Sequence, residues 1–169
     1  VENEEVEVEC EAIFLWMKCH ITDRKVKVMK ISTEIEKVAK ANKITIAMLT
    51  LEQIERIKDS IYQKYSNKNR SVFLWESLAD FSIINDKDGW AFSADFVQEK
   101  KCIMFFDECE DKACIEITGG KDLHKLLSEM YGFEFYITNF TTEYLICFNH
   151  HDCLIGCGTA KEWINTLQN

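Results

Sequence analysis

The chain has 169 residues, with 20 Lys and Arg against 29 Asp and Glu, a formal net charge of −9, eight cysteines and no proline. This length and a hydrophobic fraction of 47% predict one globular domain with a dense core, and they exclude a disordered or collagen-like chain. No run of about 18 apolar residues occurs, and the acidic start differs from the basic start of a secretory signal, so we expect a soluble cytoplasmic protein without a membrane-spanning helix.

The acidic residues are unevenly distributed along the chain. Residues 71–169 carry ten more acidic than basic residues, whereas residues 23–70 are net basic. A polyanion such as DNA loses its main binding term against a net-acidic surface, and a basic protein is attracted to one. The charge therefore disfavours nucleic acid as a partner and favours a basic protein.

Two stretches near the N-terminus alternate apolar and charged residues, as strands with one wet face do. They cover 6–16, where the charged residues are glutamates, and 26–31, where they are mainly lysines. Two helices are expected next, each opened by a capping box in which two side chains satisfy each other's free backbone N–H groups. The two boxes are Thr33 with Glu36 and Thr50 with Gln53.

The rest of the chain alternates short apolar segments with turn residues and amphipathic stretches. The expected elements are a helix over 71–78, strands over 81–84, 90–96, 102–106 and 113–117, a helix over 123–130, strands over 133–138, 144–148 and 153–156, and a final helix opened by a Thr159–Glu162 capping box.

Strands joined mainly by turns, with helices at intervals, predict an α+β fold with a largely antiparallel sheet and several amphipathic helices. The apolar run 102–106 predicts a central strand that is buried on both faces. We expect a single domain over 1–169. The polar stretch 66–70 leaves open an N-terminal subregion, 1–70, beside a core of sheet and helices, 71–169.

One local cluster contains metal-ligating and nucleophilic side chains. It comprises Cys147, His150, His151 and Asp152. Thiolates and imidazoles are the ligands that zinc prefers. A four-residue loop before Cys153, however, would turn Cys147 and Cys153 to opposite sides of the sheet, where they cannot share an ion. We therefore expect no metal and no cofactor, with Cys147 as a small buried hydrophobe.

Part of the chain resembles a family of small bacterial proteins of unknown function. The resemblance is carried by 132–139, 144–152, which contains the hairpin motif Cys-Phe-Asn-His-His-Asp, 154–156 and Trp163. It extends mainly over residues 100–167. Proteins of this size and acidity look like the immunity or antitoxin partners that are encoded beside secreted toxins. The resemblance implies a binding protein and supplies no catalytic residues.

We therefore expect a non-enzymatic acidic protein that neutralises a basic toxin, such as a nuclease, by occluding its active site. The carboxylates expected to contact the partner are Asp107, Glu108, Glu110, Asp111, Glu143 and Asp152. The alternative is a metal- or thiol-dependent enzyme centred on the Cys147–Asp152 cluster. A regulatory or scaffold domain with an unrelated partner fits the same residues, and the oligomeric state stays open.

Overall fold

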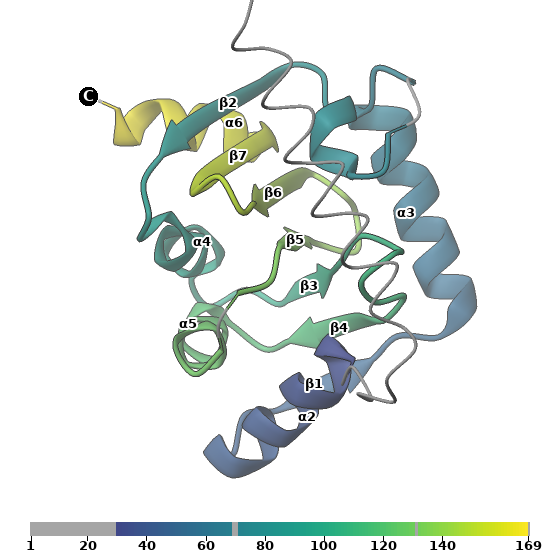
Figure 1. Ribbon diagram of the computed structural model, residues 1–169, viewed down its shortest axis with the longest axis vertical. Helices are drawn as coiled ribbons and strands as arrows, with labels where there is room; N and C mark the ends of the chain where they lie inside the picture. Colours follow the sequence, from purple (N-terminus) through teal and green to yellow (C-terminus); the bar gives the residue numbers. More distant parts are fainter. Residues whose placement is uncertain (1–29, 69–70, 131, 169) are drawn as a thin grey trace, which may run out of the picture.

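The computed structural model describes residues 30–68, 71–130 and 132–168, and in these residues one sheet is covered by helices on both faces (Figure 1). The α-helices are α2 (Ile31–Asn42), α3 (Leu51–Tyr65), α4 (Gly89–Val97), α5 (Gly120–Ser128) and α6 (Thr159–Leu167), with a short 3₁₀-helix, η2, at Leu74–Ser77. The strands are β1 (Ile46–Met48), β2 (Phe81–Asn85), β3 (Cys102–Phe105), β4 (Cys114–Ile117), β5 (Phe135–Thr138), β6 (Tyr144–Phe148) and β7 (Cys153–Gly158). The predicted α+β class is confirmed.

The strands form an antiparallel sheet in the order β1-β4-β3-β5-β6-β7-β2. All residues of β3 are buried, as the unbroken apolar run of this segment predicts. The described part of the N-terminal subregion belongs to the same sheet, because β1 pairs with β4 and α3 packs on one face.

The two faces of the sheet have separate hydrophobic cores. On one face, which we call the four-helix face, α2, α4, α5 and α6 pack against alternate strand residues such as Met104 and Ile146. On the other, the α3 face, Ile57 and Ile61 of α3 pack against the intervening residues, such as Ile103. Figure 1 shows α3 on one side of the sheet and α4 and α5 on the other.

Two glycines permit unusually close backbone approaches. A Cβ at Gly120 would overlap the carbonyl oxygen of Ala94, so the first turn of α5 can lie against α4 only without a side chain there. Gly158 precedes α6 with a φ of +61°, and a Cβ at this position would overlap the carbonyl oxygen of Glu143 and the hydroxyl of Tyr65. The start of α6 is thereby held against the loop between β5 and β6.

Two of the expected elements are wrong. Residues 90–96, predicted as a strand, belong to α4. The alternation of bulky residues in this segment is also satisfied by a helix that is apolar on most sides, because α4 lies between the sheet and α5. The helix predicted over 71–78 is reduced to the 3₁₀-helix η2, which is a single short turn.

The capping predictions have mixed outcomes. The box at α3 is confirmed, because Thr50 N–H donates to Gln53 Oε1 (2.9 Å) and Gln53 N–H donates to Thr50 Oγ1 (3.3 Å). The Thr33 box is wrong, because α2 already begins at Ile31. The Thr159–Glu162 box is also wrong, because Gly158 occupies the N-cap of α6 and has no side chain to accept a hydrogen bond.

The strands predicted at 6–16 and 26–31 lie outside the described residues, except for the last two positions of the second, where Ile31 begins α2. Within the described ranges, none of the helices combines the length and the apolarity that crossing a membrane requires.

Candidate functional site

The antiparallel pairing brings several predicted site residues to one end of the sheet. The end of β3, the start of β5, the end of β6 and the start of β7 are neighbours in the ladder. The loops 107–111 and 149–152 therefore lie at the same end, with Glu134 at the start of β5 between them. We call this region the Asp107 end. Glu143 lies in the loop between β5 and β6, at the opposite end of the sheet, which we call the Glu143 end.

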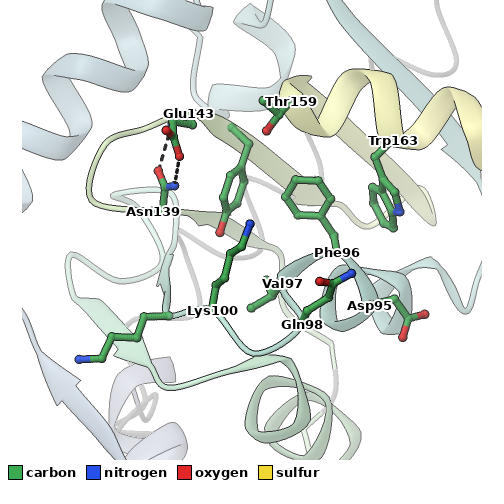
Figure 2. Close-up of a pocket in the computed structure, with 11 residues that line it drawn as sticks. Asp95, Phe96, Val97, Gln98, Lys100, Asn139, Glu143, Thr159 and Trp163 are labelled. Carbon is green, nitrogen blue, oxygen red and sulfur yellow. Dashed lines mark hydrogen bonds between the residues drawn. The ribbon is translucent and has the colours of Figure 1, made fainter.

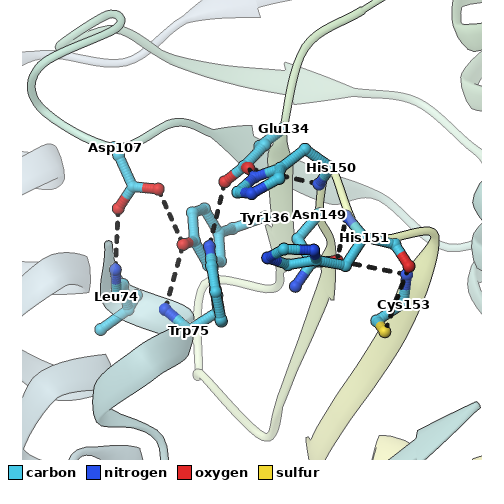
Figure 3. Close-up of polar contacts among 9 residues, drawn as sticks. All are labelled: Leu74, Trp75, Asp107, Glu134, Tyr136, Asn149, His150, His151 and Cys153. Carbon is cyan, nitrogen blue, oxygen red and sulfur yellow. Dashed lines mark hydrogen bonds and ion pairs between the residues drawn. The ribbon is translucent and has the colours of Figure 1, made fainter. Parts of the chain in front are cut away.

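Asp107 is buried and fixes η2 to the sheet. Its carboxylate accepts hydrogen bonds from the backbone N–H of Leu74 (2.9 Å) and the hydroxyl of Tyr136 (2.8 Å), as Figure 3 shows. Burial raises the pKa of Asp107 to about 6, and the nearby Glu134 charge adds to the increase, whereas the two hydrogen bonds oppose it. This carboxylate therefore points into the protein rather than towards a partner.

Asp111 is also buried, and it caps a distant helix. Its Oδ2 atom accepts a hydrogen bond from the backbone N–H of Ser32 in the first turn of α2 (2.8 Å), and its Oδ1 accepts one from Ala113 N–H (3.1 Å). Burial alone would raise the pKa of Asp111, but the hydrogen bonds from Ser32 and Ala113 outweigh burial and hold the pKa below its usual value. The carboxylate satisfies a free N–H group at the positive end of α2.

The remaining predicted carboxylates divide between the two ends. Glu108 is exposed beside Lys58 of α3, at 3.5 Å, and Glu110 is half-buried. Asp152 is exposed at the Asp107 end, and Glu143 is exposed at the Glu143 end. The six carboxylates therefore do not form one exposed cluster, and only Glu108 and Asp152 are both exposed and at the same end.

Glu134 is the residue of this end that the sequence analysis does not identify. It is buried, and its Oε2 accepts a hydrogen bond from the indole Nε1 of Trp75 (3.0 Å). Its Oε1 accepts a hydrogen bond from the backbone N–H of His150 (3.2 Å) and also contacts the ring Nδ1 of His150. The one sequence signal for this role is a carboxylate between Phe133 and Phe135 in an otherwise apolar segment.

These contacts arrange four rings at the surface. The Trp75 ring lies 5.9 Å from the His150 ring and 5.6 Å from the His151 ring, edge-on to both, and the two histidine rings are 4.0 Å apart. Phe73 stacks on Trp75 at 5.9 Å. Both histidines are exposed, and Phe73 and Trp75 are partly exposed. We call Phe73, Trp75, His150 and His151 the Trp75 surface, and Figure 3 shows its Trp75 and the two histidines.

The loop that carries the histidines is held by its own residues. Asn149 is buried, and its side-chain Oδ1 accepts hydrogen bonds from the backbone N–H groups of His151 (3.1 Å) and Cys153 (3.2 Å). Asp152 has a φ of +56°, a conformation that aspartate tolerates better than most residues. The exposed imidazoles therefore extend from a fixed backbone.

The register of this hairpin corrects the prediction for its cysteines. Cys147 pairs with Ile155, so Cys147 and Cys153 face the same side of the sheet, the α3 face, and not opposite sides. The reason is that the pairing is shifted by one residue from the predicted register, with Phe148 opposite Leu154 rather than Cys153 and with Asp152 in the left-handed conformation.

Cys147 is completely buried. Burial, followed by the charges of Glu134 and Asp107, raises the pKa of Cys147 well above its usual value, so this thiol stays protonated. Within the ranges that the structure describes, no group of three or more His, Cys, Asp and Glu side chains is placed to hold a metal ion.

A comparison with known protein families found a match for this chain. Residues 27–168 match a family of unknown function (DUF6756). None of the curated proteins and none of the solved structures matched. The family match covers most of the chain, including α2, every strand of the sheet and the Trp75 surface, and it confirms the resemblance to a family of unknown function. The protein is therefore a member of the DUF6756 family.

Proposed function

We propose that this protein is a non-enzymatic binding protein that captures a partner with a basic surface through its Asp107 end, as an immunity protein captures its toxin. The contact would be centred on the Trp75 surface and bordered by exposed carboxylates. The observation that carries the proposal is the position of Trp75, which is held partly exposed beside two exposed histidines by a buried carboxylate.

Trp75 has the features of an interface anchor. Tryptophan is enriched among the residues that dominate binding energy, and a preorganised side chain loses less entropy when a partner docks. Glu134 fixes both the Trp75 indole and the backbone of His150. Burial of a carboxylate is unfavourable unless it is paired and hydrogen-bonded, and here its bonds go to two residues that reach the surface. The arrangement supports a surface selected for a fixed shape.

The charge of this end supports a basic partner. Asp152 lies beside Asp86, whose backbone N–H donates to the Asp152 carbonyl (2.9 Å), and Asp86 and Asp88 are joined by a further hydrogen bond (2.9 Å). Glu108 is exposed at the same end, and the chain as a whole has a net charge of −9. Such a distribution attracts a basic protein over a distance and accelerates association. A toxin nuclease, which must itself attract phosphate, is the partner type that fits.

The test needs a partner, and the product of the coding sequence adjacent to this one is the candidate. After co-purification, Kd is measured for the wild type and for Trp75→Ala, which should weaken binding by about thirtyfold or more. The double variant Glu108→Lys/Asp152→Lys should slow association by about tenfold at low ionic strength and by less at high ionic strength.

The matched control reverses two exposed carboxylates at the Glu143 end, Glu99 between α4 and β3 and Glu162 in the first turn of α6. Glu99→Lys/Glu162→Lys changes the net charge by the same amount. Equal slowing by the two double variants would show that only total charge matters, and unchanged binding by Trp75→Ala would remove the Trp75 surface from the proposal.

The enzymatic alternative is separated by a different measurement. A catalytic or metal-binding thiol needs a lowered pKa, whereas burial raises the pKa of Cys147. If the protein is instead a zinc enzyme centred on Cys147, His150, His151 and Asp152, then protein purified without an affinity tag contains stoichiometric zinc, which His150→Ala removes. That result would overturn the proposal of a non-enzymatic binder.

A further inference from the structure

The Glu143 end contains a cavity that the proposed function does not use. Its volume is about 470 Å³, within the range of about 300–1,000 Å³ that is usual for small-molecule sites. It lies between the last turn of α4, the segment that joins α4 to β3, the loop between β5 and β6 with the first residue of β6, and the first turns of α6 (Figure 2). Four separate elements therefore contribute to its walls.

One wall of the cavity is aromatic. The Phe96 ring lies 4.8 Å from the Tyr144 ring and 5.0 Å from the Trp163 ring, at interplanar angles of 75° and 51°. All three residues line the cavity, and Phe96 and Trp163 are partly exposed. Partly exposed rings held in place by their neighbours offer faces and edges against which a planar molecule can stack.

Tyr144 brings an unpartnered polar group to this wall. The residue is only 7% exposed, and its hydroxyl forms no hydrogen bond with any of the described residues. The hydroxyl keeps access to solvent, so it is available to donate to a molecule in the cavity. Burial, followed by the charges of Cys102 and Glu143, raises the pKa of Tyr144, so the hydroxyl keeps its proton and remains a donor.

Further donors border the same cavity. The Lys100 ammonium is exposed and forms no ion pair with the described residues, whereas the neighbouring Lys101 is paired with Glu116 at 2.6 Å. The first turn of α6 follows Gly158, which pairs with Tyr144 in the sheet and supplies no side-chain cap. The Thr159 N–H of that turn already donates to the Glu143 carbonyl (3.2 Å), and the remaining N–H groups and the helix dipole favour a negative group.

The lining also contains two carboxylates, Glu143 and Asp95. Glu143 accepts a hydrogen bond from the Asn139 amide (2.7 Å), which engages it with its own loop, and its charge also acts on the Tyr144 hydroxyl. Asp95 lies at the margin, and Figure 2 shows its carboxylate pointing away from the Phe96 ring. The inner part of the cavity therefore combines aromatic surface with hydrogen-bond donors.

We propose that this cavity binds a small planar molecule carrying one carboxylate or phosphate group, with its ring against Phe96 and Trp163 and its anionic group bonded to the Tyr144 hydroxyl and the Lys100 ammonium. The site lies at the opposite end of the sheet from the Trp75 surface. It is therefore independent of the proposed protein partner.

The test is calorimetric titration at low ionic strength with four probes. Adenosine 5′-monophosphate and 1-naphthoate supply a planar ring with a phosphate or a carboxylate, and adenosine and inorganic phosphate supply each part alone. We expect at least one aromatic anion to bind about tenfold more tightly than adenosine or inorganic phosphate. Preference between the two aromatic anions shows which of these two probes fits the site better. Failure of both to bind, or binding of adenosine as tight as that of its monophosphate, overturns the proposal.

Two variants test the residues. Tyr144→Phe removes one hydroxyl and keeps the ring that packs against Phe96, and it should weaken binding of the aromatic anion by about tenfold. Lys100→Gln, at an exposed position, should weaken it by about fivefold. The matched controls are Tyr62→Phe on α3 and Lys125→Gln in the last turn of α5, both exposed and neither among the residues that line the cavity. Equal affinities in wild type, Tyr144→Phe and Lys100→Gln would contradict the assignment.

Discussion

The two ends of the sheet fix their loops with different chemistry. At the Asp107 end, two buried carboxylates hold η2 and the histidine loop. At the Glu143 end, hydroxyls do this work: buried Thr142 contacts the hydroxyl of Ser60 (2.6 Å) and the ammonium of Lys64 (2.7 Å) on α3. Buried charge is costly, so it persists where a group at the surface must be held in one orientation. At the Glu143 end the buried group is the neutral hydroxyl of Thr142, and the charged partner, Lys64, is an exposed residue.

Gly158→Ala should produce the largest loss of stability, at the Glu143 end. The new methyl group would overlap the Glu143 carbonyl and the Tyr65 hydroxyl at a φ of +61°, and we expect the free energy of unfolding to fall by about 3 kcal/mol. Gly132→Ala is the matched control, because Gly132 has a φ of +71° but no atom within 4 Å of its Cβ position. Urea denaturation should show a loss of only about 1 kcal/mol for the control. Equal losses of stability in the two variants would mean that the positive φ alone, and not the overlap with Glu143 and Tyr65, makes glycine necessary at position 158.

Glu134→Ala should have the next largest effect, at the Asp107 end. It removes the acceptor of the Trp75 indole and of the His150 backbone, and we expect a loss of about 2 kcal/mol with a red shift of Trp75 fluorescence. Glu116→Ala is the control, since Glu116 lies on β4 and its carboxylate pairs with the exposed Lys101 at the surface. Its loss should stay below about 1 kcal/mol. If the two variants are equally stable, Glu134 does not brace the Trp75 surface.

The pH dependence of stability should distinguish the two buried aspartates. The pKa of Asp107 is about 6 in the folded protein, above its unfolded value of about 3.9, so the folded state binds this proton more tightly. Its contribution to the free energy of unfolding is therefore lost as the pH rises from about 4 to about 6, by roughly 3 kcal/mol at most. Asp111 has a lowered pKa, so its contribution is lost instead as the pH falls below about 4.

The variant Asp107→Asn tests whether Asp107 causes the loss of stability between about pH 4 and about pH 6. Denaturation curves of wild type and variant, measured from pH 4 to pH 7, should diverge in slope across this window, with the variant showing the flatter profile. Parallel profiles would contradict the assignment of the raised pKa to Asp107.

Gln98→Gly should have the smallest effect, and it is expected to stabilise. Gln98 lines the cavity at the Glu143 end with a φ of +52°, a region that favours glycine. Replacement should raise the free energy of unfolding by about 1 kcal/mol. Thermal unfolding of the variant checks this, and a lower melting temperature would show that the Gln98 side chain contributes more than its backbone conformation costs.

The elements that could be predicted from sequence are those with strong local periodicity. The strand at 102–106 and the helix around Leu123 are both observed, because each depends on a repeating apolar pattern. The apolar residues of the segment 90–96 match both the two-residue repeat of a strand and a helix that is apolar on most sides. The segment forms a helix because it packs between the sheet and α5.

The candidate site was harder to predict, because its contacts join distant parts of the chain. Asp111 bonds to Ser32 across 79 residues, and Glu134 bonds to the Trp75 indole across 59. An exposed and a buried carboxylate are identical in a sequence. The acidic loop 107–111 was therefore predicted as a surface, although two of its carboxylates are used internally.

The most direct test of a binding surface at the Asp107 end is hydrogen–deuterium exchange of the protein with and without its co-purified partner. The account predicts protection of the backbone at 72–77, 107–111 and 149–153, with no change at 139–143. Protection confined to 139–143, or to the helices of the four-helix face, would contradict it.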